Sequence, residues 1–156
     1  MEMHELRLDL KDNEELKGHI KAIIDLMGEN SNREGLLRTP LRVAKAMEEW
    51  YGGYCQKAED VLNRTFSSEG YKGIIIVKDI DFYSHCEHHM TPFFGKAHIG
   101  YIAKKHITGL DKLVKIVEVF SRRLQNQERL TDQIADAIDK VSKPLGVIVV
   151  VEAQHF

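Results

Sequence analysis

The order of hydrophobic patterns in the second half of the chain constrains the fold more than any other feature. A β-branched run at 73–77 predicts a strand, and alternating apolar and polar residues over 95–103 predict a strand with one buried face. Apolar residues at helical spacing follow over 110–120 and 130–141, and a second β-branched run at 147–153 predicts another strand. This β-β-α-α-β order predicts an α+β fold, in which an antiparallel sheet carries two helices on one face. The edges of so small a sheet are expected either to lie under helices and loops of the same chain or to pair with another chain.

The first part of the chain predicts helices instead. Asp12 is a plausible N-cap for a helix whose apolar residues recur at helical spacing up to Met27. Thr39 as N-cap, with Pro40 as the first helical residue, predicts a second helix, and residues 58–64 predict a short third one.

Composition excludes several classes of protein. The 156 residues are 43% hydrophobic and 29% charged, which is typical of a globular domain and unlike disordered or collagen-like chains. The net charge of −2, with no basic block, makes nucleic acid a poor candidate partner. No apolar run approaches the roughly 18 to 20 residues that cross a bilayer, and the acidic N-terminus does not resemble a signal peptide. We therefore expect a cytoplasmic protein without a membrane partner, whose Cys55 and Cys86 form no disulfide framework.

Histidines gather in one short segment, and one cysteine lies among them. Four of the eight, His85, His88, His89 and His98, lie within fourteen residues. Cys86 and His89 have the C-x-x-H spacing with which a loop offers two ligands to one zinc ion, and a distant third ligand would complete a catalytic site. The alternative is a buried cysteine beside hydrogen-bonded surface histidines. The H-x-E sequence at 85–87 lacks the P-C-x-x-C that accompanies it in zinc deaminases, so that class is excluded.

Charged residues mark the starts of the two predicted helices. Lys112 and Lys115 are unfavourably placed for a helix dipole unless an anion binds there, and the alternative is an ordinary solvated lysine face. Glu128 at the next helix start either stabilises that helix or contacts a ligand.

These segments together resemble the type I GTP cyclohydrolases. The matching residues run from about residue 34 to the end of the chain, in the order that the family has. In the first half they are Glu34-Gly35-Leu36, Thr39-Pro40-x-Arg42-Val43-Ala44-Lys45 and Phe82-Tyr83-Ser84-x-Cys86-Glu87-His88-His89. In the second half they are Pro92-Phe93-Phe94-Gly95-Lys96-Ala97-His98-Ile99, Gly109-Leu110-x-Lys112-Leu113, Arg122-Arg123-Leu124-Gln125-x-Gln127-Glu128-Arg129-Leu130-Thr131 and Val150-x-Glu152-Ala153-x-His155.

The resemblance implies a fold and a reaction. The fold is the tunnelling fold, whose subunits join their sheets into a continuous barrel in a homodecamer. Residues 1–66 would form an N-terminal helical region and 67–156 the tunnelling-fold catalytic domain, the two making one functional unit. The reaction converts GTP and water to 7,8-dihydroneopterin triphosphate and formate, the first step of tetrahydrofolate and pterin biosynthesis, with zinc as cofactor.

The resemblance also implies roles for individual residues. Cys86 and His89 are zinc ligands, His88 is the acid that protonates the purine imidazole, and His155 is the second catalytic histidine. The substrate-binding residues that it implies are Gln127 and Glu128 at the guanine edge, together with Leu110, Lys112, Lys115, Arg42 and Lys45, of which the four cationic residues match positions near the triphosphate. A glutamate accepts hydrogen bonds from both N1 and the exocyclic amine of guanine, a donor pair that adenine lacks.

Two departures from the family pattern bear on activity. Asp111-Lys112-Leu113-Val114-Lys115 replaces the usual Ser-Lys-x-x-Arg, so an anion stands near the expected triphosphate and Lys115 lacks the bidentate fork of arginine. The family also continues past Phe156 with a cysteine as third zinc ligand, an arginine and the last strand, so by this comparison the catalytic domain is C-terminally incomplete. The alternative function is therefore a catalytically dead purine- or pterin-binding member of the same fold. The related nitrile reductases are disfavoured, because no cysteine stands at a plausible nucleophile position.

Overall fold

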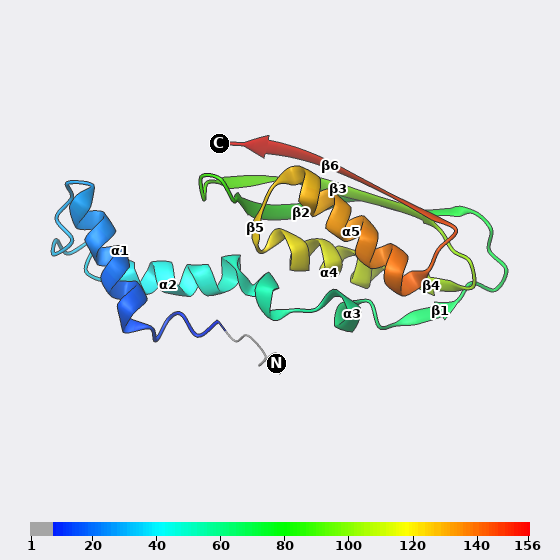
Figure 1. Ribbon diagram of the computed structural model, residues 1–156, viewed down its shortest axis with the longest axis horizontal. Coiled ribbons are helices and arrows are strands. Elements are labelled where there is room, and N and C mark those ends of the chain that lie inside the picture. Colours follow the sequence, from blue (N-terminus) through cyan, green and yellow to red (C-terminus); the bar gives the residue numbers. More distant parts are fainter. Residues whose placement is uncertain (1–7) are drawn as a thin grey trace.

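A computed structural model describes residues 8–156 and has two parts, a helical arm and a body built on a sheet (Figure 1). The arm contains α1 (Glu14–Leu26) and α2 (Thr39–Trp50), and the 3-10 helix η1 (Gly52–Cys55) and α3 (Ala58–Val61) lead into the body. The strands are β1 (Thr65–Ser67), β2 (Ile74–Cys86), β3 (Pro92–Ile102), β4 (His106–Thr108), β5 (Leu124–Gln125) and β6 (Gly146–His155). The two long helices of the body are α4 (Leu110–Ser121) and α5 (Gln127–Ser142).

The main sheet has the strand order β5-β2-β3-β6. The three long strands are antiparallel to their neighbours, and this confirms the expected α+β layout. The short β5, which no sequence pattern indicated, differs, because it pairs in parallel with the end of β2 (His85↔Leu124, Cys86↔Gln125). It forms where the connection from α4 to α5 passes beside that end. β1 and β4 make a separate two-stranded sheet.

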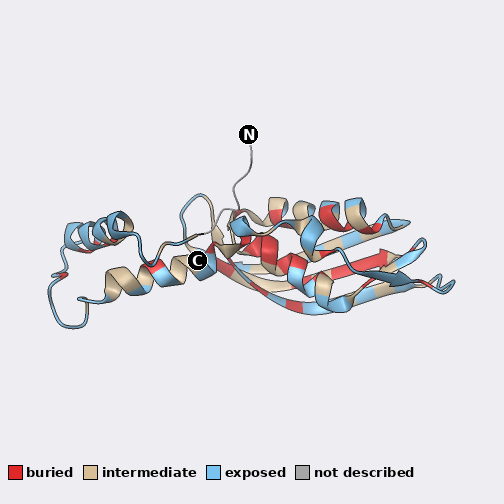
Figure 2. Cartoon of the chain, turned by 90° about the horizontal axis from the view of Figure 1, so that it is seen from below, coloured by how far each residue is buried: buried red, intermediate tan, exposed pale blue. Residues whose placement is uncertain are grey.

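α4 and α5 cover one face of the main sheet, and the core lies between these layers (Figures 1 and 2). The largest buried side chains there include Tyr101, Phe93 and Leu62. Alternation along β2 turns Ile80, Phe82 and Ser84 toward the helices and leaves Asp81 and Tyr83 exposed on the opposite face.

β2 is much longer than the predicted strand at 73–77, because a bulge interrupts its pattern without ending it. The register with β3 shifts between Val77 and Ile80, and Asp79 takes a positive φ of 59°. The imidazole Nδ1 of His98 accepts a hydrogen bond from the Asp79 amide at 3.2 Å. The shift keeps apolar residues on the helix side both before and after the bulge. Residues 83–86, predicted to lie between strands, therefore belong to β2.

Caps fix the helix boundaries. Asn126 begins α5 by accepting from the Arg129 amide at 2.7 Å, so this helix starts three residues before the first apolar residue of the predicted pattern. In the arm, the cap of α1 is Asn13 and not Asp12, because the Asn13 side chain accepts from the Leu16 amide at 2.8 Å. Thr39 is already the first residue of α2 and Arg38 its cap.

The arm is held by a small core of its own. Ile20, Ile24 and Ala44 are buried where α1 packs against α2, and the arm projects from the body in Figures 1 and 2. Among residues 8–156, no helix is both long and apolar enough to cross a membrane. Cys55 and Cys86 are both free thiols.

Candidate active site

The connection between β2 and β3 is a tight turn that presents Cys86, His88 and His89 together. The Cys86 amide donates to the Thr91 carbonyl at 2.8 Å, and the Met90 amide donates to the Cys86 carbonyl at 2.7 Å. Met90 takes a positive φ of 56°, which is uncommon for a residue with a side chain. The turn therefore has a defined conformation, and it leaves both imidazoles exposed.

The distance between donor atoms in this turn fits part of a zinc site. The Cys86 Sγ lies 3.8 Å from Nδ1 of His89 and 3.8 Å from Nδ1 of His88. Two such ligands on one tetrahedral zinc ion, with bonds of about 2.3 and 2.1 Å, would place sulfur and nitrogen about 3.6 Å apart. Within the described residues, no group of three or more His, Cys, Asp or Glu side chains is placed to hold a metal ion. The turn thus offers two of the ligands that a zinc site needs.

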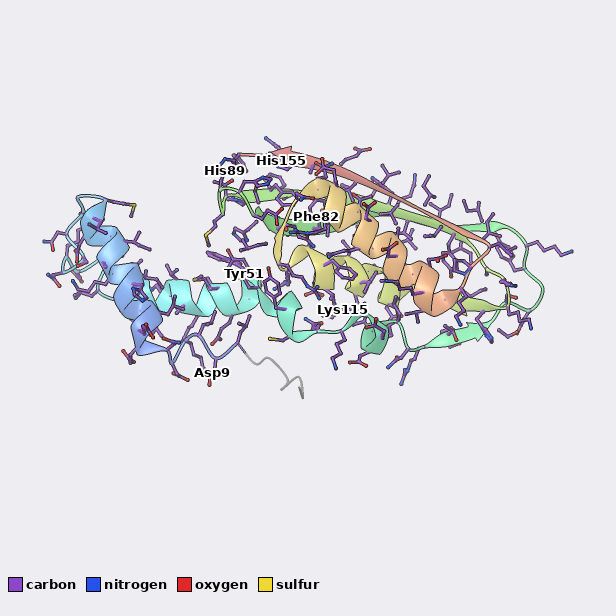
Figure 3. The ribbon with its side chains drawn as sticks, in the orientation of Figure 1. Asp9, Tyr51, Phe82, His89, Lys115 and His155 are labelled. Carbon is purple, nitrogen blue, oxygen red and sulfur yellow. The ribbon has the colours of Figure 1, made fainter. Side chains whose placement is uncertain are left out.

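His155 lies at the same end of the sheet, at the end of β6, as Figure 3 shows beside His89. Its ring stacks on Phe93 with centroids 4.8 Å apart and planes 3° from parallel. Its Nε2 is 3.0 Å from Oε1 of Gln127, whose Nε2 donates to the Val151 carbonyl at 2.8 Å. Gln127 is therefore bonded to β6, and its neighbour Glu128 stands exposed in the first turn of α5.

Gly95 allows the strands that carry this end to approach closely. A Cβ at this position would lie 1.8 Å from the Glu152 carbonyl oxygen on β6, so any larger residue would push β3 and β6 apart. Gly95 pairs with Ala153, two residues before His155. The close approach of β3 and β6 at Gly95 therefore helps to set the position of the His155 imidazole.

Glu87 joins the turn to the start of α5. Its carboxylate accepts from Arg129 Nη2 at 2.5 Å and from Asn126 Nδ2 at 2.9 Å, and its amide donates to the Gln125 carbonyl at 2.9 Å. The hydrogen bond from Arg129, followed by that from Asn126, holds the pKa of the Glu87 carboxyl below its ordinary value, against an opposing effect of burial.

His85 fastens the arm to the same end of the body. Its ring lies 5.0 Å from that of Trp50 and 5.4 Å from that of Tyr51, at the end of α2. Burial lowers the pKa of His85, which favours the neutral imidazole between these rings. His85 therefore contacts aromatic rings and His98 contacts the backbone of the bulge. Neither is part of a group of described side chains that could hold a metal ion.

We call the end of the sheet that carries Cys86, His88, His89 and His155 the histidine end. The opposite end, where α4 begins, is the lysine end, and it carries Leu110 and Lys112. The register pairs Phe93 with His155 and Tyr101 with Val147, and Tyr101 contacts Thr108 just before α4. Eight residues of strand separate Phe93 from Tyr101, about 26 Å at a rise of about 3.3 Å per residue.

The predicted triphosphate residues are therefore not brought to the histidine end within one chain. Lys112 contacts Asp111 at 3.2 Å and Lys115 contacts Glu118 at 2.8 Å, both within α4, and Figure 3 shows Lys115 well apart from His89 and His155. Arg42 and Lys45 are exposed on α2, in the projecting arm.

Comparison with known proteins decides the family. Residues 16–156 match the family described as GTP cyclohydrolase I. The chain is 57% identical over 147 residues to GTP cyclohydrolase 1 of Parabacteroides distasonis, an alignment that covers 94% of this chain and 75% of the relative. It is 57% identical over 140 residues to the protein of the same name from Porphyromonas gingivalis, covering 90% and 72%. For the Bacteroides thetaiotaomicron protein of that name the identity is 56% over 142 residues, covering 91% and 72%.

The chain belongs to the GTP cyclohydrolase I family.

The structure of this GTP cyclohydrolase I family member adds residues that sequence reasoning passed over. Glu87 and Arg129 stood inside matching segments without a role, and the ring under His155 is Phe93. One signal pointed to Arg129: a cation in the first turn of a helix opposes the dipole and calls for an anionic partner. Nothing in the spacing indicated that the partner would be Glu87, 42 residues away.

Proposed function

We propose that this protein converts GTP and water to 7,8-dihydroneopterin triphosphate and formate, the first step of pterin and tetrahydrofolate biosynthesis. The helical region and the catalytic domain would act as one unit. The observation that carries the proposal is the convergence of Cys86, His88, His89 and His155 with Glu128 at the histidine end. The imidazoles of His88 and His155 would transfer protons there, Cys86 and His89 would hold a metal ion, and the Glu128 carboxylate would recognise the base.

In this proposal Cys86 and His89 hold a zinc ion. Their 3.8 Å separation supports a shared ion. Because no third His, Cys, Asp or Glu side chain of the described residues is grouped with them, a further protein ligand would have to come from elsewhere. Zinc bound there would supply a nucleophile for C8 of guanine, because it lowers the pKa of bound water toward neutrality.

His155 is held in one tautomer. The Val151 carbonyl can only accept, so the amide NH₂ of Gln127 faces it and the amide oxygen faces His155. That oxygen accepts from Nε2–H, which leaves Nδ1 of a neutral His155 as the atom that takes a proton. Gln127 in this role orients the catalytic base, and its predicted contact with guanine would need these two bonds to break.

His88 is suited to donate the proton that the purine imidazole takes up. Two-thirds of its side chain is exposed, at 66%, and Glu87 Oε1 lies 3.9 Å from its Nε2, so the imidazolium has a nearby anion. An imidazole can both donate and accept a proton, so His88 and His155 can exchange protons with the substrate as the ring opens.

Glu128 would select guanine. Its carboxylate is exposed in the first turn of α5, one residue after Gln127, which contacts His155. Two acceptor oxygens match N1–H and the exocyclic amine of guanine, whereas adenine would leave them unpaired at a cost in binding.

The triphosphate would be bound by a second copy of the chain. Leu110 and Lys112 lie about a sheet's length from His155, farther than one nucleotide reaches, and Lys115 follows about one turn later along α4. We infer that one chain does not complete the site. Assembly of subunits into the family's decameric barrel would bring the lysine end of one copy to the histidine end of another. Among the described residues, β6 pairs only with β3, and its other edge is available for such an assembly.

The test compares Cys86→Ser with Cys55→Ser. We expect the wild-type protein to produce a pterin from GTP, detected by fluorescence after oxidation, and to contain about one zinc ion per subunit. Cys86→Ser should lose both zinc and turnover and keep its helical circular dichroism. Cys55→Ser removes an exposed thiol of the connection to the arm and should keep both. Turnover and zinc retained in Cys86→Ser would refute the metal assignment, and wild-type binding of GTP without turnover would favour the alternative, a binding protein.

A further inference from the structure

The two elements that carry the proposed site are far apart in sequence and are joined by the backbone pairing of β2 with β5 and by the side chain of Glu87. The turn after β2 carries Cys86, His88 and His89, and the start of α5 carries Gln127 and Glu128. Glu87 bridges them, since its carboxylate contacts Arg129 and Asn126 and its amide contacts the Gln125 carbonyl.

Arg129 is itself fixed from several directions. Its Nη2 donates to the Leu124 carbonyl at 2.8 Å as well as to Glu87, and its Nε donates to Gln125 Oε1 at 2.9 Å. Gln125 is buried, and its Nε2 donates to the Phe120 carbonyl at 2.9 Å and to Gln133 Oε1 at 2.8 Å. The planar guanidinium thus connects Glu87 to the buried Gln125 and to the start of α5.

The surroundings of the Glu87–Arg129 pair indicate that it positions the turn after β2, and that it contributes little to the free energy of unfolding. The side chains of Arg129 and Glu87 are 41% and 28% exposed, and they line a cavity of about 550 Å³. Ion pairs that water reaches contribute little to the free energy of unfolding. An arginine in the first turn of a helix is also unfavourable for the dipole. What the pair does provide is a defined distance between the histidine-bearing turn and the first turn of α5.

We propose that Arg129, acting through Glu87, is a positioning residue that holds the Cys86–His89 turn at a fixed place relative to Glu128. The inference rests on the proposed function, since a base held at Glu128 must meet the imidazoles of the turn at a reactive distance. In this role Arg129 and Glu87 would act through the turn, without contact with the base or the reacting atoms.

Arg129→Lys tests this most sharply, because lysine keeps the charge and loses the fork that bonds Glu87, Leu124 and Gln125 together. We expect amide hydrogen exchange to become at least about tenfold faster in residues 86–90 and to stay unchanged in 134–138 of α5. With GTP as substrate, kcat should fall about tenfold to hundredfold while KM changes less than about threefold, because the guanine contact at Glu128 is kept.

Controls separate this role from a merely structural one. Arg33→Lys alters a comparable pair, Arg33 with Glu29 at 2.9 Å on the arm, and should change neither exchange in 86–90 nor kcat. Glu87→Gln should reproduce the faster exchange of Arg129→Lys, and the double variant should lose less than the sum of the two single losses, because both variants remove the Glu87–Arg129 interaction.

Three results would overturn the proposal. The first is unchanged exchange in residues 86–90 of Arg129→Lys. The second is faster exchange throughout α5 with a normal kcat per folded molecule, which would make the pair structural only. The third is additive losses in the double variant. If the wild-type protein does not turn over GTP, the proposed function fails separately, and the exchange contrast between 86–90 and 134–138 still decides whether Arg129 holds the turn.

Discussion

The two ends of the sheet are built differently. At the histidine end, the side chains bond to one another across elements: Gln127 to His155, His155 onto Phe93, and Glu87 to Arg129. On α4, the contacts of Lys112 and Lys115 among residues 8–156 are with acidic residues of the same helix, Asp111 and Glu118. The histidine end is thus organised by contacts between elements of one chain, whereas the ion pairs described for Lys112 and Lys115 stay within α4. If GTP binding depends on a second copy, as proposed, changes at the two ends should have different consequences.

The largest loss of stability is expected at the histidine end from Phe93→Ala. Phe93 is fully buried, packs edge-on against Phe82 with centroids 5.8 Å apart, and supports the ring of His155. Truncation should lower the free energy of unfolding by about 3 to 5 kcal/mol in urea denaturation. Phe66→Ala, on the exposed β1 near the lysine end, should change it by less than about 0.5 kcal/mol. Equal losses in the two variants would contradict the assigned core.

A smaller loss is expected at the lysine end from Tyr101→Phe. The Tyr101 hydroxyl accepts from the Thr108 amide at 3.0 Å and donates to the Thr108 carbonyl at 3.3 Å, and both residues are buried. Its removal leaves these backbone groups unpaired and should cost about 1 to 3 kcal/mol in the same denaturation experiment. Because Tyr101 lies far from the histidines, kcat of the folded fraction should not change. A lowered kcat would contradict this and show that Tyr101 influences the reaction, through its own chain or through a second copy.

The smallest change in stability and a clear change in binding are expected for Lys115→Ala. Its ion pair with Glu118 is exposed, so the free energy of unfolding should change by less than about 0.5 kcal/mol. If Lys115 of a second copy contacts the triphosphate, KM for GTP should rise about tenfold or more. Lys140→Ala, in the last turn of α5, serves as the control and should leave KM unchanged. An unaltered KM in Lys115→Ala would show that Lys115 is an ordinary solvated side chain without a part in GTP binding.

Acid should weaken the histidine end through Glu87. Its folded-state pKa is lowered from 4.5, first by Arg129, so the ion pair contributes fully above the unfolded pKa and is lost as pH falls through the folded value. The melting temperature of the wild type should therefore fall more steeply below about pH 4.5 than that of Glu87→Gln, which carries no charge to lose. Parallel pH profiles for the two proteins would contradict the lowered pKa.

The order of helices and strands was predictable because it depends on the local spacing of apolar residues. Alternation over 95–103 and helical spacing over 110–120 and 130–141 depend on neighbours in sequence, and the strands and helices formed as expected. The length of β2 was not predictable, because the bulge at Asp79 breaks the alternation that marks a strand. The early start of α5 depends on the cap that Asn126 provides, which lies outside the apolar pattern.

The site was predictable only in its residue types. The C-x-x-H spacing gave Cys86 and His89 as neighbours, and their side chains do lie 3.8 Å apart. Contacts between distant segments, such as Glu87 with Arg129, have no spacing rule. The separation of Lys112 from His155 likewise follows from how α4 lies along the sheet, which no local pattern contains.

Subunit complementation tests most directly whether the site is shared between copies. His88→Ala impairs the histidine end and Lys112→Ala the lysine end, and each variant alone should have little activity. If every site takes its two ends from different chains, random assembly of equal amounts of the co-expressed variants leaves about one-quarter of the sites intact, so about a quarter of the wild-type turnover should return. Co-expression of His88→Ala with His155→Ala, both at the histidine end, should restore none. Activity of the first pair no greater than the sum of its separate variants would contradict a site completed by a second copy.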